Sequence, residues 1–442
     1  MKRSIRLFFT IVFTLVLFGC QQDDSTDKIG NMDITSVSNS DSKFTIKMTK
    51  EVYHDKILGA LVGSAIGDAM GAPTEMWQRY NRQIEYGFVD SLDPVSITPS
   101  AEGVWDFNLP KGATTDDTRW KVFMGKYMIK KANDFYGTLP ADPFLFAEYV
   151  TESYEEEMKN LKSTDEYDTK NYELNLKRIA WLQEWALVAN AFETKDIEKY
   201  NYELSKFYGG DILCAGMLYA PMVGLPYPGN PLKAYESSFR LAIFDQGYAK
   251  DVTALTSAMQ AAAMDLKATP ESVMSVFRDV DPNEYFSRRI FGRLTYQAYK
   301  DSYYFSEQAK AISSPDQIKL KMDFGNYDPL FAAQMQKAFN QLDSKKQEYS
   351  PHAKEILMIS ITAMMFCDFD FRKTMEFITN YGRDNDTAAA VAGSILGAYH
   401  GFNKLPKDLV KTVLETNKTK MGIDLEILAQ KLTDSLYSDG SI

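Results

Sequence analysis

Apolar residues recur every three or four positions along most of the chain after residue 50, a spacing that places them on one face of an α-helix. Alternation of apolar and polar residues with a period of two, which is typical of strands, is scarce. The pattern therefore predicts an all-α fold. The helices that we expect span Glu51–Met70, Asp116–Ala132, Phe144–Leu161, Tyr172–Phe192, Leu232–Phe244, Val252–Leu266, Pro270–Arg278, Tyr285–Tyr299, Pro329–Leu342, Pro351–Phe366, Phe371–Asn380, Asn385–Tyr399, Pro406–Thr416 and Asp424–Leu436.

No clean linker interrupts this helical pattern, so we expect a single domain over residues 51–442. The acidic stretch Thr151–Lys177 is expected to include an exposed insertion. A hydrophobic fraction of 45% and a charged fraction of 25% are ordinary for a globular protein. No repeat of about 34 residues appears, which argues against a helical-repeat solenoid.

The first 19 residues have the features of a signal peptide. A basic start precedes the apolar run Leu7–Phe18, which is too short to span a bilayer. The run leads to Leu17-Phe18-Gly19-Cys20, which resembles a bacterial lipobox, and residues 20–50 then read as a lipidated Cys20 and a flexible tether. We expect a lipoprotein of the cell envelope, anchored to the outer membrane or cell surface by Cys20, with its folded part outside the cytoplasm. A plain signal peptide is the alternative.

Charge and composition narrow the chemistry further. The net charge of −11 argues against nucleic-acid binding, which normally needs a basic surface. Three Cys and three His in 442 residues make a disulfide scaffold or a zinc site built from these residues improbable, so any metal would be bound by oxygen atoms. Cys214 and Cys367 stand in apolar runs and are expected to be buried and reduced.

Glycines spaced four residues apart mark two of the predicted helices. They are Gly59, Gly63, Gly67 and Gly71 in the first, and Gly393, Gly397 and Gly401 in the second. Each glycine inside a helix costs about 1 kcal/mol relative to alanine. Close approach of another helix would offset that cost, so we expect both helices to lie in the crowded centre of the domain, where the polar residues at their ends come together.

Two acidic clusters stand directly before predicted helices: Thr115-Asp116-Asp117-Thr118 and Asp384-Asn385-Asp386-Thr387. Either could simply cap its helix, but one cap needs one side-chain oxygen and each cluster supplies two carboxylates and a hydroxyl. Four carboxylates in one place would repel one another unless cations lie between them. Hard cations such as Mg²⁺ or Mn²⁺ prefer such oxygen ligands. The nearby pair Asp368 and Asp370 has no further ligands and is expected to lie in a loop.

These clusters, together with Gly-Ala-Leu-Val-Gly-Ser-Ala-Ile-Gly-Asp-Ala-Met-Gly-Ala-Pro-Thr-Glu over Gly59–Glu75, resemble three motifs of the ADP-ribosylglycohydrolase family, in the same order. That family includes the dinitrogenase reductase–activating glycohydrolase. The resemblance covers residues 52–415. It implies a compact orthogonal helical bundle around a binuclear Mg²⁺ or Mn²⁺ centre, and hydrolysis of an ADP-ribosyl bond.

The resemblance also implies roles for individual residues. The metal ligands would be Thr115, Asp116, Asp117, Asp384, Asp386 and Thr387. Glu75 and Asp117 would be catalytic, with Glu75 as the general acid/base. Asp68 would orient backbone near the site. The substrate would be free or protein-linked ADP-ribose or a nucleoside-like glycoside.

The substrate half of the motif departs from the family pattern. Leu218 stands where family members often have an arginine, and Gly382-Arg383 replaces a Gly-Gly pair. The region Asp279–Tyr349 is dense in Tyr and Phe, which could supply an aromatic platform for a base. Two alternatives to a glycohydrolase remain open: a non-catalytic surface lipoprotein that binds a sugar or nucleotide, and an inactive relative that retains metal.

Overall fold

The computed structural model describes residues 46–96, 108–136, 140–162, 169–288 and 290–437, all of which belong to one compact unit, Ser42–Ile442. The signal peptide, Cys20 and most of the predicted tether lie outside the described residues. The prediction of an all-α fold is confirmed. Within the described ranges, the only paired strands are the two-residue β1 (Val95–Ser96) and β2 (Asn108–Leu109), which run antiparallel.

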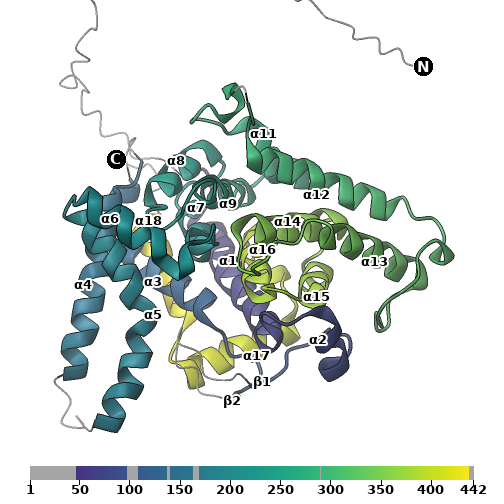
Figure 1. Ribbon diagram of the computed structural model, residues 1–442, viewed down its shortest axis with the longest axis horizontal. Coiled ribbons are helices and arrows are strands. Elements are labelled where there is room, and N and C mark those ends of the chain that lie inside the picture. The colour runs from purple at the N-terminus through teal and green to yellow at the C-terminus, as the bar shows by residue number, and fades with distance from the viewer. Residues whose placement is uncertain (1–45, 97–107, 137–139, 163–168, 289, 438–442) are drawn as a thin grey trace, which may run out of the picture. The chain divides into compact units, whose positions relative to one another are not determined.

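Figure 1 shows the helices of the first half, with the purple helix α1 near the centre and α3–α9 to its left and above it. They are α1 (Lys50–Gly71), η1 (Ala72–Thr74), α2 (Arg79–Tyr86), α3 (Asp116–Lys130), η2 (Ala132–Phe135), α4 (Pro143–Lys162), α5 (Thr169–Glu193), α6 (Ile197–Lys206), η3 (Phe207–Gly210), η4 (Ala215–Leu218), α7 (Ala220–Gly224), α8 (Pro231–Leu241) and α9 (Ala249–Ala263).

The second half adds a layer in which α14 and α15 flank α16 (Figure 1). Its elements are α10 (Pro270–Met274), α11 (Val276–Asp279), η5 (Tyr285–Ser287), α12 (Leu294–Lys310), η6 (Pro315–Gln317), α13 (Pro329–Asp343), α14 (Ala353–Phe366), α15 (Phe371–Tyr381), α16 (Asn385–His400), η7 (Phe402–Lys404), α17 (Lys407–Thr416), the π-helical η8 (Asn417–Met421) and α18 (Leu425–Leu436).

The prediction of one helix over Tyr285–Tyr299 is wrong. Only a short 3₁₀ turn forms at Tyr285–Ser287, and α12 begins at Leu294 and continues to Lys310. Gly292 has a φ of +60°, which interrupts a helix. The side chain of Arg293 is drawn inward to a buried ion pair with Asp251, at 2.7 Å, which fixes the start of α12. The predicted helix Pro270–Arg278 is also divided, between α10 and α11.

Helices α1 and α16 form the closest helix pair of the fold, and they run antiparallel. Cβ atoms built on Gly59 and Gly63 would collide with the carbonyl oxygens of Gly397 and Gly393, respectively. The prediction that the glycines permit close helix contact is therefore confirmed, and the partner of each glycine helix is the other. The pairing brings the C-terminal end of α1 beside the N-terminal end of α16.

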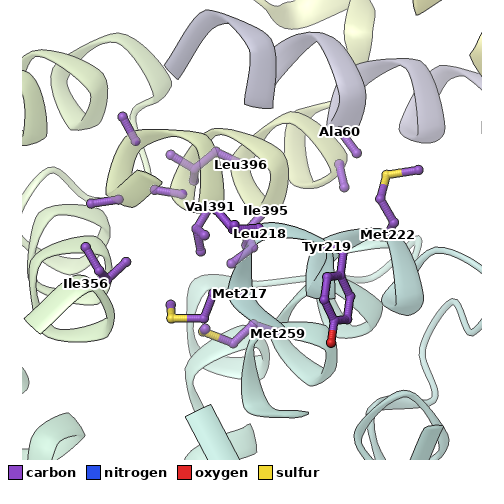
Figure 2. Packing of buried hydrophobic residues seen from close by; sticks show 14 of the residues in the cluster. Ala60, Met217, Leu218, Tyr219, Met222, Met259, Ile356, Val391, Ile395 and Leu396 are labelled. Atoms are coloured by element: carbon purple, nitrogen blue, oxygen red, sulfur yellow. The ribbon is translucent and has the colours of Figure 1, made fainter. Parts of the chain in front are cut away.

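The core around this pair is continuous across most helices. Figure 2 shows Leu218 of η4 beside Val391 and Ile395 of α16, with Met217 and Met259 below them. Leu218, which replaces the arginine often found in the family, is 8% exposed and packs in this core. Cys214 and Cys367 are buried and unpaired, as predicted.

One segment of the described chain, Lys50–Thr74, is long and apolar enough to cross a membrane by length and composition. It consists of α1 and η1. The most apolar part of this segment is completely buried within the folded unit, as is usual for a core helix.

Candidate metal centre and its pocket

Asp68, on α1, organises the start of α3. Its Oδ1 accepts hydrogen bonds from the backbone N–H and the hydroxyl of Thr115, both at 2.9 Å. Its Oδ2 accepts bonds from the N–H and hydroxyl of Thr118, at 2.9 and 2.6 Å. A carboxylate from another helix thus satisfies N–H groups at this helix start. The role expected for Asp68, which is to orient backbone near the site, is the one that the structure shows.

The two acidic clusters do not act as ordinary caps. Thr115 and Asp384 occupy the N-cap positions of α3 and α16, yet neither side chain accepts a capping hydrogen bond. Ordinary caps occur elsewhere in the fold: Asp370, which we expected in a loop, caps α15 by accepting a bond from Lys373 N. Capping therefore does not explain why the clusters are acidic.

The clusters meet in space although they lie far apart in the sequence. The hydroxyl of Thr387 donates to Oδ2 of Asp117 at 3.0 Å, across 270 residues. The hydroxyl oxygen of Thr115, whose proton is donated to Asp68, lies 3.4 Å from Oδ2 of Asp386. Carboxylate oxygens of Asp116, Asp117 and Asp386 all lie within 4.8 Å of one another, which is close enough to share a cation.

Asp384 lies outside that group of three but lines the same pocket as Asp116 and Thr387. Oδ1 of Asp384 and Oδ1 of Asp386 are buried and have no hydrogen-bond partner among the described residues. Buried carboxylate oxygens without a donor are costly, and a bound cation would satisfy them. The all-oxygen donor set therefore fits hard divalent cations such as Mg²⁺ or Mn²⁺.

The electrostatics of the site show the same crowding. Burial raises the pKa of Asp117 to about 6, with a further rise from Asp116, although Lys121 opposes it. Burial and then the charge of Asp117 raise the pKa of Asp384 to about 7. Burial and then the neighbouring Glu75 raise the pKa of Asp386. Without cations, this centre would hold protons near neutral pH.

Glu75 follows η1 at the end of α1 and lines the same pocket. The next two residues are fixed against the turn that precedes α16. Met76 N donates to Arg383 O at 2.8 Å, and Arg383 N donates to Trp77 O at 3.0 Å. The turn before one acidic cluster thus holds Glu75 beside that cluster.

The pocket next to the carboxylates has a volume of about 320 Å³. It is lined by Glu75, Met76, Asp116, Trp185, Tyr208, Gly209, Asp211, Leu213, Cys214, Ala215, Leu218, Tyr349, Pro351, Asp384 and Thr387. Tyr349 comes from the region where we expected an aromatic platform, whereas Trp185 and Tyr208 come from α5 and η3. Burial, followed by nearby carboxylates, raises the pKa of the Cys214 thiol well above its usual value, which keeps it from acting as a thiolate.

The sequence analysis missed two ion pairs that hold this site. Lys121 is 1% exposed, and its Nζ lies 3.1 Å from the carbonyl oxygen and 3.3 Å from Oδ1 of Asp117. Arg383, at a φ of +71°, pairs with Glu355 at 2.6 Å. The spacing of Lys121 four residues after Asp117 was a usable signal, because such pairs share a helix face.

The structure brings together all the candidate residues that it describes: Glu75 and Asp384 line the pocket, and the others belong to the contacts given above. Comparisons with known proteins identify the family that the chain resembles. The ADP-ribosylglycohydrolase family model matches residues 49–441. An uncharacterized Escherichia coli protein, YegU, is 48% identical over 77 residues, which are 17% of this chain and 22% of that protein.

A solved structure described as an ADP-ribosylglycohydrolase-related protein complex superposes with a TM-score of 0.52 and 16% identity, covering 87% of this chain and 99% of that one. At this identity the superposition shows the shared all-α fold. The family match, in contrast, spans nearly the whole described unit, including both acidic clusters and the α1–α16 pair. The chain belongs to the ADP-ribosylglycohydrolase family.

Proposed function

We propose that this protein is a metal-dependent glycohydrolase that cleaves an ADP-ribosyl or related ribosyl glycosidic bond. The observation that carries the proposal is the convergence of Asp116, Asp117 and Asp386 beside a pocket with room for a sugar. A protein that only binds a sugar has no need for two buried acidic clusters, because their negative charges repel each other.

The residues that would hold the cations are Thr115, Asp116, Asp117, Asp384, Asp386 and Thr387. When bound, divalent cations would supply Lewis acidity that polarises the oxygen atoms of a sugar. The chain contributes the geometry: Asp68 fixes the α3 end of the centre, and the close α1–α16 contact fixes the other end. Lys121 and the Thr387 hydroxyl hold the two oxygens of Asp117 in one orientation.

Hydrolysis replaces the bond between the anomeric carbon and the leaving atom with a bond to a water oxygen. One proton leaves the water and one is gained by the leaving atom. Glu75 lines the pocket beside the acidic clusters, so we assign this proton exchange to its carboxylate. Positive charge develops on the sugar in such reactions, and the surrounding carboxylates, including Asp117, stabilise it.

We further propose that the protein acts outside the cytoplasm as a lipid-anchored lipoprotein. The support is the sequence alone: the basic and apolar start and Leu17-Phe18-Gly19-Cys20. The folded unit would then reach its substrate, free or attached to a protein, at the cell envelope.

The proposed reaction is tested by incubating the purified protein with ADP-ribosyl and ribosyl substrates in Mg²⁺, Mn²⁺ or EDTA. We expect release of the leaving group with Mg²⁺ or Mn²⁺ and none in EDTA. Glu75→Gln should abolish turnover while preserving metal binding, whereas Asp370→Asn, at an ordinary helix cap, should retain activity. Metal binding without turnover of any substrate would instead favour the inactive relative.

A further inference from the structure

Large apolar side chains are exposed where the chain passes from α11 into α12. Ile290 is 84% exposed and Phe291 is 77% exposed, and Phe286 and Leu294 are also exposed. We call these four residues the apolar tip. Figure 1 shows the segment that carries them at the top of the view, next to α11. Single exposed apolar residues are ordinary, whereas a contiguous group marks an interaction site.

The segment that carries the apolar tip is held to the folded body at both ends. At its start, Asp281 Oδ2 accepts a hydrogen bond from the N–H of Phe286 at 2.9 Å. At its end, the buried guanidinium of Arg293 donates to Asp251 Oδ1 at 2.7 Å and to the carbonyl oxygen of Val280 at 2.6 Å. The apolar side chains are therefore exposed on an anchored segment and not on a loose end of the chain.

A hollow of about 390 Å³ lies next to the apolar tip. Its lining is mostly apolar and includes Tyr248, Tyr285, Ile290, Phe291 and Leu294. The carboxylate of Asp251 reaches this lining, but it accepts hydrogen bonds from Arg293, Tyr235 and Thr295. The hollow thus offers apolar contact and no free carboxylate, so this surface favours an apolar partner over a small polar ligand.

Tyrosines continue from the apolar tip along the first turns of α12. The ring centroid of Tyr296 lies 5.0 Å from that of Phe286 and 5.9 Å from that of Tyr299. Tyr303 follows at 6.4 Å from Tyr299 and is exposed. Tyrosine rings collect at the level of lipid headgroups, because one end of the side chain is apolar and the other is polar. The order from apolar tip to tyrosines is that of a surface that enters a bilayer from the water.

Basic side chains accompany the apolar tip, although the whole chain has a net charge of −11. From position 288 to position 300 the sequence has four Arg or Lys residues and no Asp or Glu. Arg293 pairs with Asp251. Arg288 and Lys300 are exposed and form no ion pair within the described ranges, and Lys300 Nζ lies 5.4 Å from the centre of the Tyr296 ring. Basic residues at the edge of a membrane-bound surface attract anionic headgroups.

We propose that the apolar tip inserts into the surface of an anionic lipid bilayer. The four tip residues enter the edge of the apolar layer, the tyrosines of α12 lie among the headgroups, and Arg288 and Lys300 contact headgroup phosphates. This inference depends neither on the proposed hydrolysis nor on a lipid at Cys20. Such a lipid would tether the chain without fixing the face of the folded unit that meets the membrane, whereas the apolar tip fixes that face.

The test measures how deeply a nitroxide label on the apolar tip enters a membrane. Phe291→Cys is labelled in the full-length protein and mixed with vesicles of phosphatidylcholine and phosphatidylglycerol. Cys214 and Cys367 are buried, and the parent protein treated with the same reagent gives the background from Cys20. Oxygen concentrates in the bilayer, whereas a nickel chelate stays in water. We expect vesicles to increase the contact of the label with oxygen and to decrease its contact with nickel several-fold.

The matched control is a label on Ile197→Cys, because Ile197 of α6 is 73% exposed and lies outside the apolar tip. Its contact with nickel should stay unchanged when vesicles are added. Ile290→Asp, combined with Phe291→Cys, should prevent insertion, because a charged side chain is costly to place in the apolar layer. This variant should keep the melting temperature of the parent, since Ile290 is on the surface.

The contribution of the basic residues is measured on the same label. Arg288→Glu should weaken the protection from nickel, and so should high salt, which screens the attraction to phosphatidylglycerol. Lys199→Glu, at an exposed lysine of α6, should leave the protection unchanged. Vesicles of phosphatidylcholine alone should protect the label less than vesicles that contain phosphatidylglycerol.

Two results would overturn the inference. One is a label on Phe291→Cys that meets nickel on vesicles as freely as the label on Ile197→Cys. The other is protection from both reagents without vesicles, together with magnetic coupling between labels, because a second copy of the chain would then cover the apolar tip. Equal protection in Arg288→Glu and Lys199→Glu would overturn the role of Arg288.

Discussion

The guanidinium of Arg383 and the carboxylate of Glu355 form two hydrogen bonds, with Nε to Oε1 at 2.6 Å and Nη2 to Oε2 at 3.1 Å, and both side chains are buried. Both backbone groups of Gln347 bond to this pair. The N–H of Gln347 donates to Glu355 Oε2 at 2.6 Å, and the carbonyl oxygen of Gln347 accepts from Arg383 Nη2 at 2.8 Å. The segments before α16 and around Tyr349 are thus joined at one ion pair, and the backbone of Arg383 also bonds to the segment after η1.

Glu355→Ala should lower the free energy of unfolding by about 3–5 kcal/mol, because it leaves the buried Arg383 without its counter-charge. Chemical denaturation measures this change. The control is Asp279→Ala, which breaks the ion pair between Arg278 and Asp279, whose side chains are 63% and 50% exposed, respectively. This variant should lower the free energy of unfolding by less than about 1 kcal/mol. Equal effects of the two variants would contradict a structural role for the buried pair.

Asp386→Ala should lose metal binding with little change in helix content. In the parent, saturating Mg²⁺ or Mn²⁺ should raise the melting temperature, because the ions bind the folded state. Calorimetric titration and circular dichroism measure both properties. As a control, Asp370→Ala removes an ordinary helix cap. This variant should lower the free energy of unfolding by about 1 kcal/mol and should bind metal like the parent. Retained affinity in Asp386→Ala would contradict the proposed ligand set.

Metal-free protein should be more stable at pH 5.5 than at pH 8. Asp68 and Asp384 have pKa values of about 7 in the fold, against about 3.9 when unfolded. The folded state therefore binds protons more tightly, and the free energy of unfolding falls as the pH rises through this interval. Melting curves in EDTA measure the trend, and Asp384→Asn should flatten it. The stabilisation that Mg²⁺ gives should be larger at pH 8, where protons compete less with the ion for the carboxylates. A metal-free protein that is more stable at pH 8 than at pH 5.5 would contradict this prediction.

Gly63→Ala should destabilise the fold by about 2–3 kcal/mol or more, because the added methyl group meets the backbone of Gly393. Gly125→Ala, in α3, is the control, since its methyl group would meet only side-chain ends, the nearest being Leu428 Cδ1 at 3.2 Å. Thermal melts of both variants give the comparison, and an unaffected Gly63→Ala would mean that the helices separate at little cost.

Cys20→Ala should move the protein from the membrane fraction to the soluble fraction, or block its processing. Fractionation of cells followed by immunoblotting measures this. Ser25→Ala, in the same segment, should fractionate like the parent. A Cys20→Ala variant that remains with membranes would exclude lipidation at this residue.

Sequence reasoning located the acidic clusters because their composition exceeded what a helix cap needs. It also anticipated the close helix contact, since a row of glycines is costly unless another backbone approaches. The walls of the pocket gave no such signal. Tyr208 in the pocket wall, and Arg383 next to the lining residue Asp384, have positive φ values of +45° and +71°. Residues other than glycine rarely adopt such φ values, and no spacing rule predicts them.

The false helix over Tyr285–Tyr299 has a related cause. Apolar residues three and four positions apart, such as Phe286, Ile290 and Leu294, satisfied the helical pattern, but the buried bond from Arg293 to Asp251 depends on residues distant in sequence. Tertiary contacts of this kind override local periodicity.

The antiparallel α1–α16 pair has a consequence for how the protein comes into being. Residues near the beginning of the folded unit must find residues close to its end, and contacts across so long a loop form slowly. The second acidic cluster is also synthesised last. An ion that binds the proposed centre would therefore have no complete site to enter until most of the chain has been made and has closed on itself, so its uptake would mark the end of folding and could not initiate it.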